Sequence, residues 1–253
     1  CSGLVGSEMC IRDSNNPSML LIITKTSNRH STTLVCDRPN DIDKIWHGQL
    51  PSKSSYKNQF EIQNVLYFDE LKSLELNDAK NIYFEFADEN RLNEFISNLN
   101  LSQPQSRYLR NNTSRSTKID LSNLIFDMRR IKSKSEVSLI RHAAKISAKA
   151  HINIMKSCKS GLKEYEVEAD FIKHCMSERC EQAYPAIVAS GKNACVLHYT
   201  KNNSTLRPNS LLLVDAAAEY DNYASDITRT IPVSGKFNKF QKKIYEIVLK
   251  AQI

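Results

Sequence analysis

The stretch LLLVDAAAEYDNYASDITRTIPV, residues 211–233, decides how the C-terminal part of the chain folds. It begins as a fully apolar strand that ends at Asp215, and turn-forming residues at Glu219–Asn222 separate it from a second strand over Tyr223–Val233. The period of two along a strand places Asp226 on one face of the second strand, together with Ala224, Thr228 and Thr230. We therefore predict a hairpin that brings Asp215 and Asp226 onto neighbouring strands.

These two carboxylates need a partner. A carboxylate at the end of an apolar strand is costly unless a cation or hydrogen-bond donors meet it, and two carboxylates brought together repel. Two divalent metals about 3.5–4 Å apart are commonly bridged by carboxylates, so a dinuclear metal site is one solution to this spacing. The alternative is that Asp215 caps a loop and Asp226 pairs with Arg229.

His198 is a second candidate for chemistry. It lies in VLHYT, residues 196–200, after a predicted strand at Ala186–Ala189 and a turn at Ser190–Asn193. An imidazole near the metals can donate a hydrogen bond to a carbonyl or to a developing oxyanion. A surface histidine without a catalytic role is the alternative.

Two helices precede these strands. Ser133 and Glu136 form a capping-box pattern at the start of the first, and Gly161 is a candidate C-cap at its end. The second covers Glu164–Glu178. We expect both apolar stripes to face the core: Val137, Ile140, Ala144, Ala148, Ile152 and Met155 on the first helix, and Val167, Phe171 and Cys175 on the second.

The part of the chain from Met19 to about Phe126 has an α/β pattern. Strands are expected at Leu20–Thr24, Thr33–Cys36, Val65–Phe68 and Ile82–Phe86, and helices at Asp41–Trp46 and Glu89–Leu99. The polar stretch Ser102–Thr117 is an exposed connection, and a domain boundary follows near residues 118–130. A chain of 253 residues fits two such domains.

Composition excludes several classes of protein. The 35 Lys and Arg against 28 Asp and Glu give a net charge of +7, but the basic residues are scattered, so we expect no nucleic-acid partner. Apolar runs are too short to span a membrane. The seven cysteines form no CxxC pair and indicate free thiols in a reducing compartment. His174, Cys175 and Cys180 share one predicted helix without a second ligand pair, so a zinc site is disfavoured.

Both ends of the chain are unusual. Residues 1–14, CSGLVGSEMCIRDS, lack an initiator Met and the features of a signal peptide, and we interpret them as a non-native leader. Residues 238–253 have helical spacing with no residue that would end the helix. We therefore expect a fragment truncated at both ends. Without a signal peptide, the expected location is the cytoplasm.

Three segments of the sequence, taken together, carry a family resemblance. They contain MRRIKSKSEVSLIRHAAKISAKAH within Ile125–His151, IVASGKNACVLHYTKN within Tyr184–Thr200 and the residues that follow, and LLLVDAAAEYDNYASDITRTIPVSGKF within Ser210–Leu249. They resemble the first half of the catalytic domain of the aminopeptidase P family, the Xaa-Pro aminopeptidases among the pita-bread metallopeptidases. Upstream, Ser31–Gly48, with DKIWHG at its end, resembles part of that family's N-terminal domain.

The resemblance implies a fold and a site. The fold is an α/β N-terminal domain of the creatinase/aminopeptidase P type over residues 15–124, followed by a partial α+β pita-bread catalytic domain over residues 125–253. Asp215 is implied as a terminal ligand of one metal and Asp226 as the bridge between two, typically Mn2+. His198 is implied to hold the substrate carbonyl and stabilise the transition state. The implied substrates are peptides with proline in the second position, and relatives commonly form homodimers or homotetramers.

The sequence also departs from the family pattern. Ala217 and Ser225 stand where the family usually has glycine, as does Ala189 in VASG, and these changes are tolerable if the backbone there avoids positive φ. The family's remaining ligands, a His and two Glu, have no counterpart after His198 and Glu219 apart from Glu246, a poor substitute on the terminal helix. We therefore predict an inactive fragment. A prolidase, a non-catalytic pita-bread protein and a creatinase-like metal-free hydrolase are the alternatives, and the paired aspartates argue against the last two.

Overall fold

The computed structural model describes residues 19–25, 29–48, 51–74, 81–84 and 117–253. The chain divides into two compact units, Cys1–Ile131 and Lys132–Ile253, and each is described by itself. No helix among the described residues is long and apolar enough to span a lipid bilayer. The predicted helix at Glu89–Leu99 and nearly all of the polar stretch Ser102–Thr117 fall outside the described residues.

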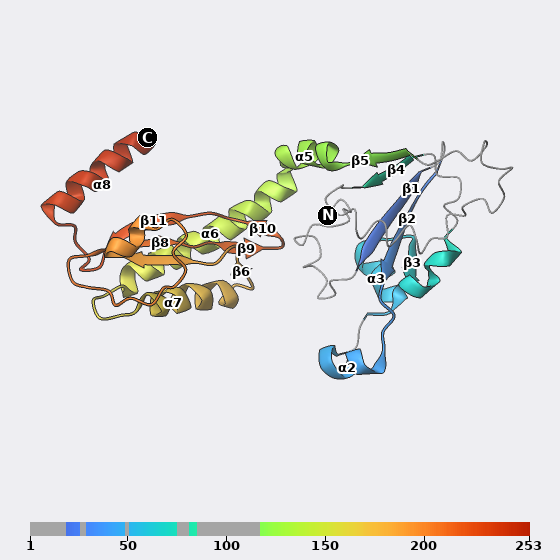
Figure 1. The fold of residues 1–253 in the computed structure, drawn as a ribbon, viewed down its shortest axis with the longest axis horizontal. Helices are drawn as coiled ribbons and strands as arrows, with labels where there is room; N and C mark the ends of the chain where they lie inside the picture. The colour runs from blue at the N-terminus through green and yellow to red at the C-terminus, as the bar shows by residue number, and fades with distance from the viewer. Residues whose placement is uncertain (1–18, 26–28, 49–50, 75–80, 85–116) are drawn as a thin grey trace, which may run out of the picture. The chain divides into compact units, whose positions relative to one another are not determined.

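The first unit contains a mixed three-stranded sheet in the order β1-β2-β3 (Figure 1). Strand β2 pairs antiparallel with β1 and parallel with β3, and the chain between β2 and β3 forms helices α2 and α3. Leu34, Cys36, Tyr56 and Val65 form a core between α3 and the sheet. This is the α/β layer that the sequence predicted. The bounds are β1 Leu20–Lys25, β2 His30–Cys36, α2 Asp41–His47, α3 Lys53–Phe60 and β3 Asn64–Tyr67.

Four further elements complete the described part of this unit, and of these the sequence predicted only β4. The 3-10 helix η1 (Phe68–Ser73) follows β3, and β4 (Asn81–Phe84) pairs in parallel with β5 (Thr117–Asp120). Helix α5 (Ser122–Arg130) follows β5 and lies within the boundary segment that the sequence predicted. Neither β5 nor α5 was expected, because their short apolar runs adjoin the polar stretch.

The second unit is built on one long hairpin whose strands are each interrupted once. Strands β8 (Leu211–Asp215) and β9 (Ala218–Tyr220) run antiparallel to β10 (Tyr223–Ala224) and β11 (Thr228–Pro232). The register runs unbroken, from Leu211 opposite Pro232 to Tyr220 opposite Tyr223. The predicted hairpin is confirmed. The predicted continuous strand Tyr223–Val233 is wrong, since residues 225–227 belong to no strand.

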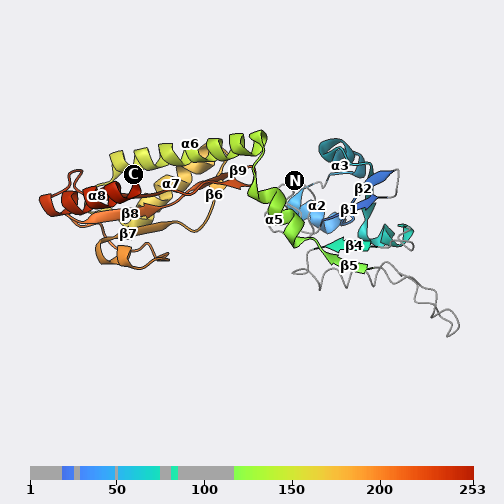
Figure 2. The ribbon, with the colours of Figure 1, turned by 90° about the horizontal axis from the view of Figure 1, so that it is seen from above.

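A two-residue turn closes the hairpin. Asp221 and Asn222 both have positive φ, 46° and 65°, as a type I′ turn requires. Strand β7 (Ile187–Ser190) adds to β8, and β6 (Glu181–Gln182) adds to β9, so the hairpin has a partner strand along both of its parts. Figure 2 shows helices α6 (Lys134–Ser157) and α7 (Glu164–Ser177) along one side of these strands.

Helix α6 presents a different face to the core from the one predicted. The buried residues are Ala143, Ile146, Ser147, Ala150, His151 and Ile154. The predicted stripe included Ala148, which is exposed, and Ile152 and Met155, which are 48% and 44% exposed. The apolar pattern predicted the wrong core face of α6 because Ser147 and His151 are buried polar residues that form hydrogen bonds with the backbone of the hairpin.

The helix ends agree with the sequence at most positions. Ser133 and Glu136 form the predicted capping box of α6, with Ser133 N donating to Glu136 Oε2 at 2.6 Å. Gly161 is not the C-cap, because α6 ends at Ser157 and Cys158 caps it. Val167, Phe171 and Cys175 of α7 are buried as expected. Helix α8 (Lys239–Gln252) forms where the terminal helix was predicted, and it has no buried residues.

Candidate metal centre

The two aspartates meet on one face of the hairpin. Asp215 is the last residue of β8 and is half-buried, and Asp226 lies in the gap between β10 and β11, where it is exposed. Asp215 lies opposite Thr228, two residues beyond Asp226. In an antiparallel pair this offset makes the two aspartates diagonal neighbours with side chains on the same face. The hairpin therefore produces the juxtaposition that the spacing predicted.

Tyr184 joins the two carboxylates. Its hydroxyl oxygen lies 2.6 Å from Asp215 Oδ1 and 3.1 Å from Asp226 Oδ1. The phenol donates to one carboxylate, and the other carboxylate is also within hydrogen-bond distance. Burial of the ring, and then the hydrogen bond to Asp215, raise the pKa of Tyr184 well above its ordinary value. The phenol thus stays protonated and acts as a donor between two like charges.

Sequence reasoning assigned no role to Tyr184. The residue lies in the connection between β6 and β7, directly before Pro185. A tyrosine just before a buried strand that adjoins β8 was a usable signal, but nothing in its spacing relates it to residues 31 and 42 positions away.

Two buried side chains of α6 form hydrogen bonds with the hairpin. Ser147 Oγ accepts from the N–H of Ala218 at 2.7 Å and lies 2.8 Å from Ser225 Oγ. His151 Nε2 donates to the carbonyl of Ala216 at 2.9 Å. Burial lowers the pKa of His151, so the ring is a neutral donor at neutral pH. The backbone next to both aspartates is therefore fixed to one rigid helix.

The small residues in place of family glycines are sterically acceptable. Ala189, Ala217 and Ser225 are absent from the described residues with positive φ. Ala217 is 1% exposed and Ser225 is 7% exposed, so each side chain is packed inside the unit. The expectation that these changes are tolerated is consistent with the backbone found here.

His198 lies on the loop between β7 and β8. It is exposed in a turn that follows η4 (Gly191–Cys195), next to Leu197, which is 89% exposed. Among the described residues, no hydrogen bond or ion pair joins His198 to Asp215 or Asp226. Its predicted role in catalysis stays a prediction.

The donor set suits a hard divalent cation but is incomplete. Carboxylate oxygens are ligands that Mn2+ and similar ions accept, and the two that converge near Tyr184 can take part in such a site. No group of three or more potential ligands from His, Cys, Asp and Glu occurs within the described ranges. Burial and then the nearby Cys180 raise the pKa of Cys175 to about 11, which is typical of a core thiol.

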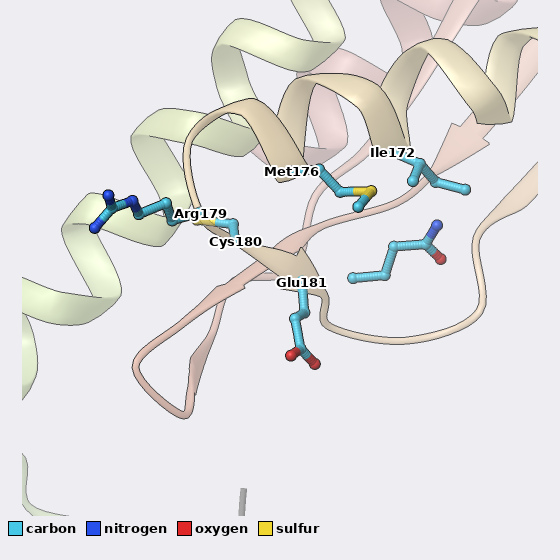
Figure 3. A pocket seen from close by; sticks show the side chains of 6 residues that line it. Ile172, Met176, Arg179, Cys180 and Glu181 are labelled. Atoms are coloured by element: carbon cyan, nitrogen blue, oxygen red, sulfur yellow. The ribbon is translucent and has the colours of Figure 1, made fainter. Parts of the chain in front are cut away.

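A shallow hollow elsewhere in the unit offers no competing site. It has a volume of about 430 Å³ and is lined by Ile172, Met176, Arg179, Cys180, Glu181 and Gln182 (Figure 3). Its lining includes none of Tyr184, Asp215 and Asp226. The polar groups of Arg179 and Glu181 point away from one another in Figure 3, so they do not converge on a ligand.

Comparison with known protein families supports the assignment of both units. Residues 14–83 match the aminopeptidase P N-terminal domain, and residues 138–253 match metallopeptidase family M24. The Xaa-Pro aminopeptidase of Escherichia coli K12 is 33% identical over 243 residues, which cover 94% of this chain and 55% of that relative. The Xaa-Pro aminopeptidase of Haemophilus influenzae is 45% identical over 136 residues, covering 53% of this chain and 31% of that relative.

Solved structures agree with this result. Proline aminopeptidase P II from Yersinia pestis superposes with a TM-score of 0.84 at 31% identity, over 94% of this chain and 56% of that one. The low-pH form of E. coli aminopeptidase P gives a TM-score of 0.86 at 29% identity, over 96% of this chain and 57% of that one. This chain spans about half the length of the relatives it matches. With an aminopeptidase P N-terminal domain followed by a pita-bread M24 fold, the chain belongs to the aminopeptidase P group of metallopeptidase family M24.

Proposed function

We propose that this chain provides the N-terminal part of a two-metal Xaa-Pro aminopeptidase, which releases the first residue of peptides with proline in the second position. The observation that carries the proposal is the convergence of Asp215 and Asp226 on the hydroxyl of Tyr184. A pair of carboxylates on one face is the arrangement that a pair of divalent cations requires. The relatives named Xaa-Pro aminopeptidase support the choice of reaction.

In this proposal the residues have distinct roles. Asp226 and Asp215 would hold two Mn2+ ions, with Asp226 as a shared ligand of both and Asp215 as a ligand of one. When bound, the ions lower the pKa of water enough for it to attack a peptide carbonyl at neutral pH. Tyr184 keeps the two carboxylates aligned through its hydroxyl. His198 holds the substrate carbonyl and donates to the oxyanion that develops during attack.

Among the described residues, the two converging carboxylates are too few ligands to hold two metal ions tightly. Two carboxylates leave most coordination positions of both ions to other groups. We therefore propose that the full-length gene product supplies further ligands, and that residues 15–253 by themselves do not catalyse hydrolysis. Homo-oligomer formation stays a prediction, which light scattering after size-exclusion chromatography measures.

The test compares the full-length gene product with two variants of it and with residues 15–253 alone, on two kinds of substrate. The full-length gene product, with Mn2+, should hydrolyse a tripeptide Xaa-Pro-Yaa, lose activity on chelation and regain it with Mn2+. The double variant Asp215→Asn and Asp226→Asn should abolish hydrolysis, whereas Asp221→Asn, in the turn of the same hairpin, should not. Cleavage of Xaa-Pro dipeptides alone would indicate a prolidase. Activity of purified residues 15–253 would show that the donor set is sufficient after all.

A further inference from the structure

The loop that carries His198 has an exposed tip on a buried base. The chain leaves β7 at Ser190, passes through η4, and returns to the start of α7 at residues 204–206. At the tip, Val196 and Leu197 are 55% and 89% exposed, and His198 is exposed as well. At the base, Ser190 and Asn202 are buried. The position of His198 at the exposed tip therefore depends on the contacts that fix the base of the loop.

The base is organised around Glu164, the first residue of α7, whose side chain is completely buried. Its Oε1 accepts from the N–H and the hydroxyl of Ser190, both at 2.7 Å, and from Asn193 Nδ2 at 3.1 Å. Its Oε2 accepts from the hydroxyl of Tyr199 at 2.7 Å and from the N–H of Ser204 at 2.9 Å. Five donors from both arms of the loop thus meet one carboxylate.

The charge state of Glu164 fits this arrangement. Burial raises the pKa of the carboxyl, but the hydrogen bonds from Ser190, Ser204 and Tyr199 outweigh it, and the pKa lies below its usual range. The ionised group therefore accepts charge-assisted hydrogen bonds, which are shorter and stronger than neutral ones. All five donors are uncharged groups, so the carboxylate organises the loop and does not form a salt bridge with it.

A second brace holds the returning arm. Asn202 has a positive φ of 42° and is 2% exposed. Its Oδ1 accepts from the N–H of Val188 at 3.0 Å, and its Nδ2 donates to Glu168 Oε2 and to the carbonyl of Ala186, each at 2.9 Å. The segment between Asn193 and Asn202 is therefore fixed at both ends, with His198 between them.

We propose that Glu164 is a positioning residue for His198. It binds Asn193 on one side of the histidine and Tyr199 directly after it, and so sets where the imidazole stands relative to the carboxylate hairpin. This inference rests on the proposed function, in which His198 contacts the substrate carbonyl. Glu164 itself acts through the loop and touches no reacting atom.

Replacing Glu164 by Gln keeps the shape and removes the charge and one acceptor. An amide NH2 cannot accept from the donors that meet it, so either Ser190 and Asn193 or Tyr199 and Ser204 lose their partner. Loss of a single oxyanion donor costs roughly 10²–10³-fold in kcat, and a misplaced donor costs up to that amount. We expect Glu164→Gln to lower kcat by roughly 10-fold or more and to change KM little.

The first experiment follows amide hydrogen exchange of the 253-residue chain. Glu164→Gln should speed exchange in residues 190–206 and leave the hairpin unchanged. Glu166→Gln is the matched control, because this exposed carboxylate of the same helical turn accepts only from the N–H of Lys163 among the contacts seen, at 2.7 Å. Equal exchange of the loop in wild type and Glu164→Gln would overturn the proposal.

The second experiment is a double-mutant cycle in the full-length gene product. If Glu164 acts through His198, adding Glu164→Gln to His198→Ala should lower kcat no further. Additive losses would overturn the inference and leave the proposed function intact, whereas a wild-type protein without Xaa-Pro hydrolysis would overturn both. If Glu164→Gln does not fold, Tyr199→Phe is the variant that tests the proposal, because it removes one hydrogen-bond donor to Glu164 and keeps the aromatic ring. It should show a smaller loss of kcat that also vanishes in the His198→Ala background.

Discussion

Asp215 and Asp226 are diagonal neighbours in one antiparallel register, in which Asp215 lies opposite Thr228, two residues beyond Asp226. This relationship follows from the two-residue turn at Asp221 and Asn222, which fixes the pairing along the whole hairpin. A one-residue slip would turn one of the two carboxylates to the opposite face. The geometry of the candidate metal centre is therefore set at the turn, several residues away from either aspartate.

Tyr184→Phe should weaken metal binding. The variant keeps the ring and removes the hydroxyl that lies within hydrogen-bond distance of both carboxylates. Loss of an outer hydrogen bond to a ligand typically costs on the order of 10–100-fold in metal affinity. Titration of the metal-free full-length gene product with Mn2+, followed by calorimetry, measures the change.

The matched control for this variant is Tyr223→Phe. Tyr223 lies in β10 of the same hairpin and donates to Glu136 Oε1 at 3.1 Å, away from the aspartates. Removal of the Tyr223 hydroxyl should leave the Mn2+ affinity within about twofold of that of the wild-type protein. If both phenylalanine variants bind Mn2+ like wild type, the hydroxyl of Tyr184 has no part in holding the ligands.

Asp226→Asn should cause a greater loss of metal than Asp215→Asn. In the proposed roles a bridging carboxylate fixes both ions and a terminal one fixes a single ion. The expected metal content is near zero for Asp226→Asn and about one ion per chain for Asp215→Asn, both in the full-length gene product. Atomic absorption after dialysis measures it, and equal stoichiometry in the two variants would contradict the assigned roles.

Phe171→Ala should destabilise the second unit strongly. The side chain is 1% exposed, and its ring meets His151 edge-on with centroids 5.6 Å apart. Removing a buried phenylalanine costs about 3–5 kcal/mol in free energy of unfolding. Phe240→Ala, on α8 at 73% exposure, should change it by less than about 0.5 kcal/mol in the 253-residue chain. Urea unfolding followed by circular dichroism compares the two, and similar losses would contradict the core described here.

The first unit should lose stability in acid through Glu70. Hydrogen bonds from Lys53 and then from the N–H of Tyr67 lower the pKa of this carboxyl from 4.5 to about 2. Because the folded state prefers the ionised form, this stabilisation is complete above pH 4.5 and is lost as the pH falls towards 2.

Glu70→Gln removes that dependence. Between pH 5 and pH 3, the free energy of unfolding of the first unit should fall less steeply in Glu70→Gln than in wild type, as urea titrations at each pH would measure. Glu61→Gln, at an exposed carboxylate of the same unit, is the control and should follow the wild-type slope. Parallel slopes for all three proteins would rule out Glu70 as the source.

Local patterns in the sequence predicted much of the fold. The capping box at Ser133, the hairpin and the meeting of the two aspartates depend on residues close together in the chain, where periodicity and turn chemistry decide. The core face of α6 depends instead on tertiary contacts. Ser147 and His151 are buried because the hairpin backbone supplies their partners, and an apolar pattern does not detect residues of that kind.

The same limit applies to the site. Tyr184 and Glu164 act on residues far along the chain, through a hydroxyl and a carboxylate that resemble any surface group in the sequence. Their importance follows from burial and convergence, which only the folded arrangement shows. His198 was a candidate because it precedes the hairpin and because of the family resemblance, and in the described residues no hydrogen bond or ion pair joins it to either aspartate.

The hairpin also has a consequence for synthesis of the protein. Tyr184 and Asp226 are 42 residues apart, so the phenol and both carboxylates leave the ribosome within a few seconds of each other at about 5–20 residues per second. The three side chains can therefore meet once residues 184–226 have left the ribosome. The phenol donor reduces the repulsion between the two charges before any cation binds.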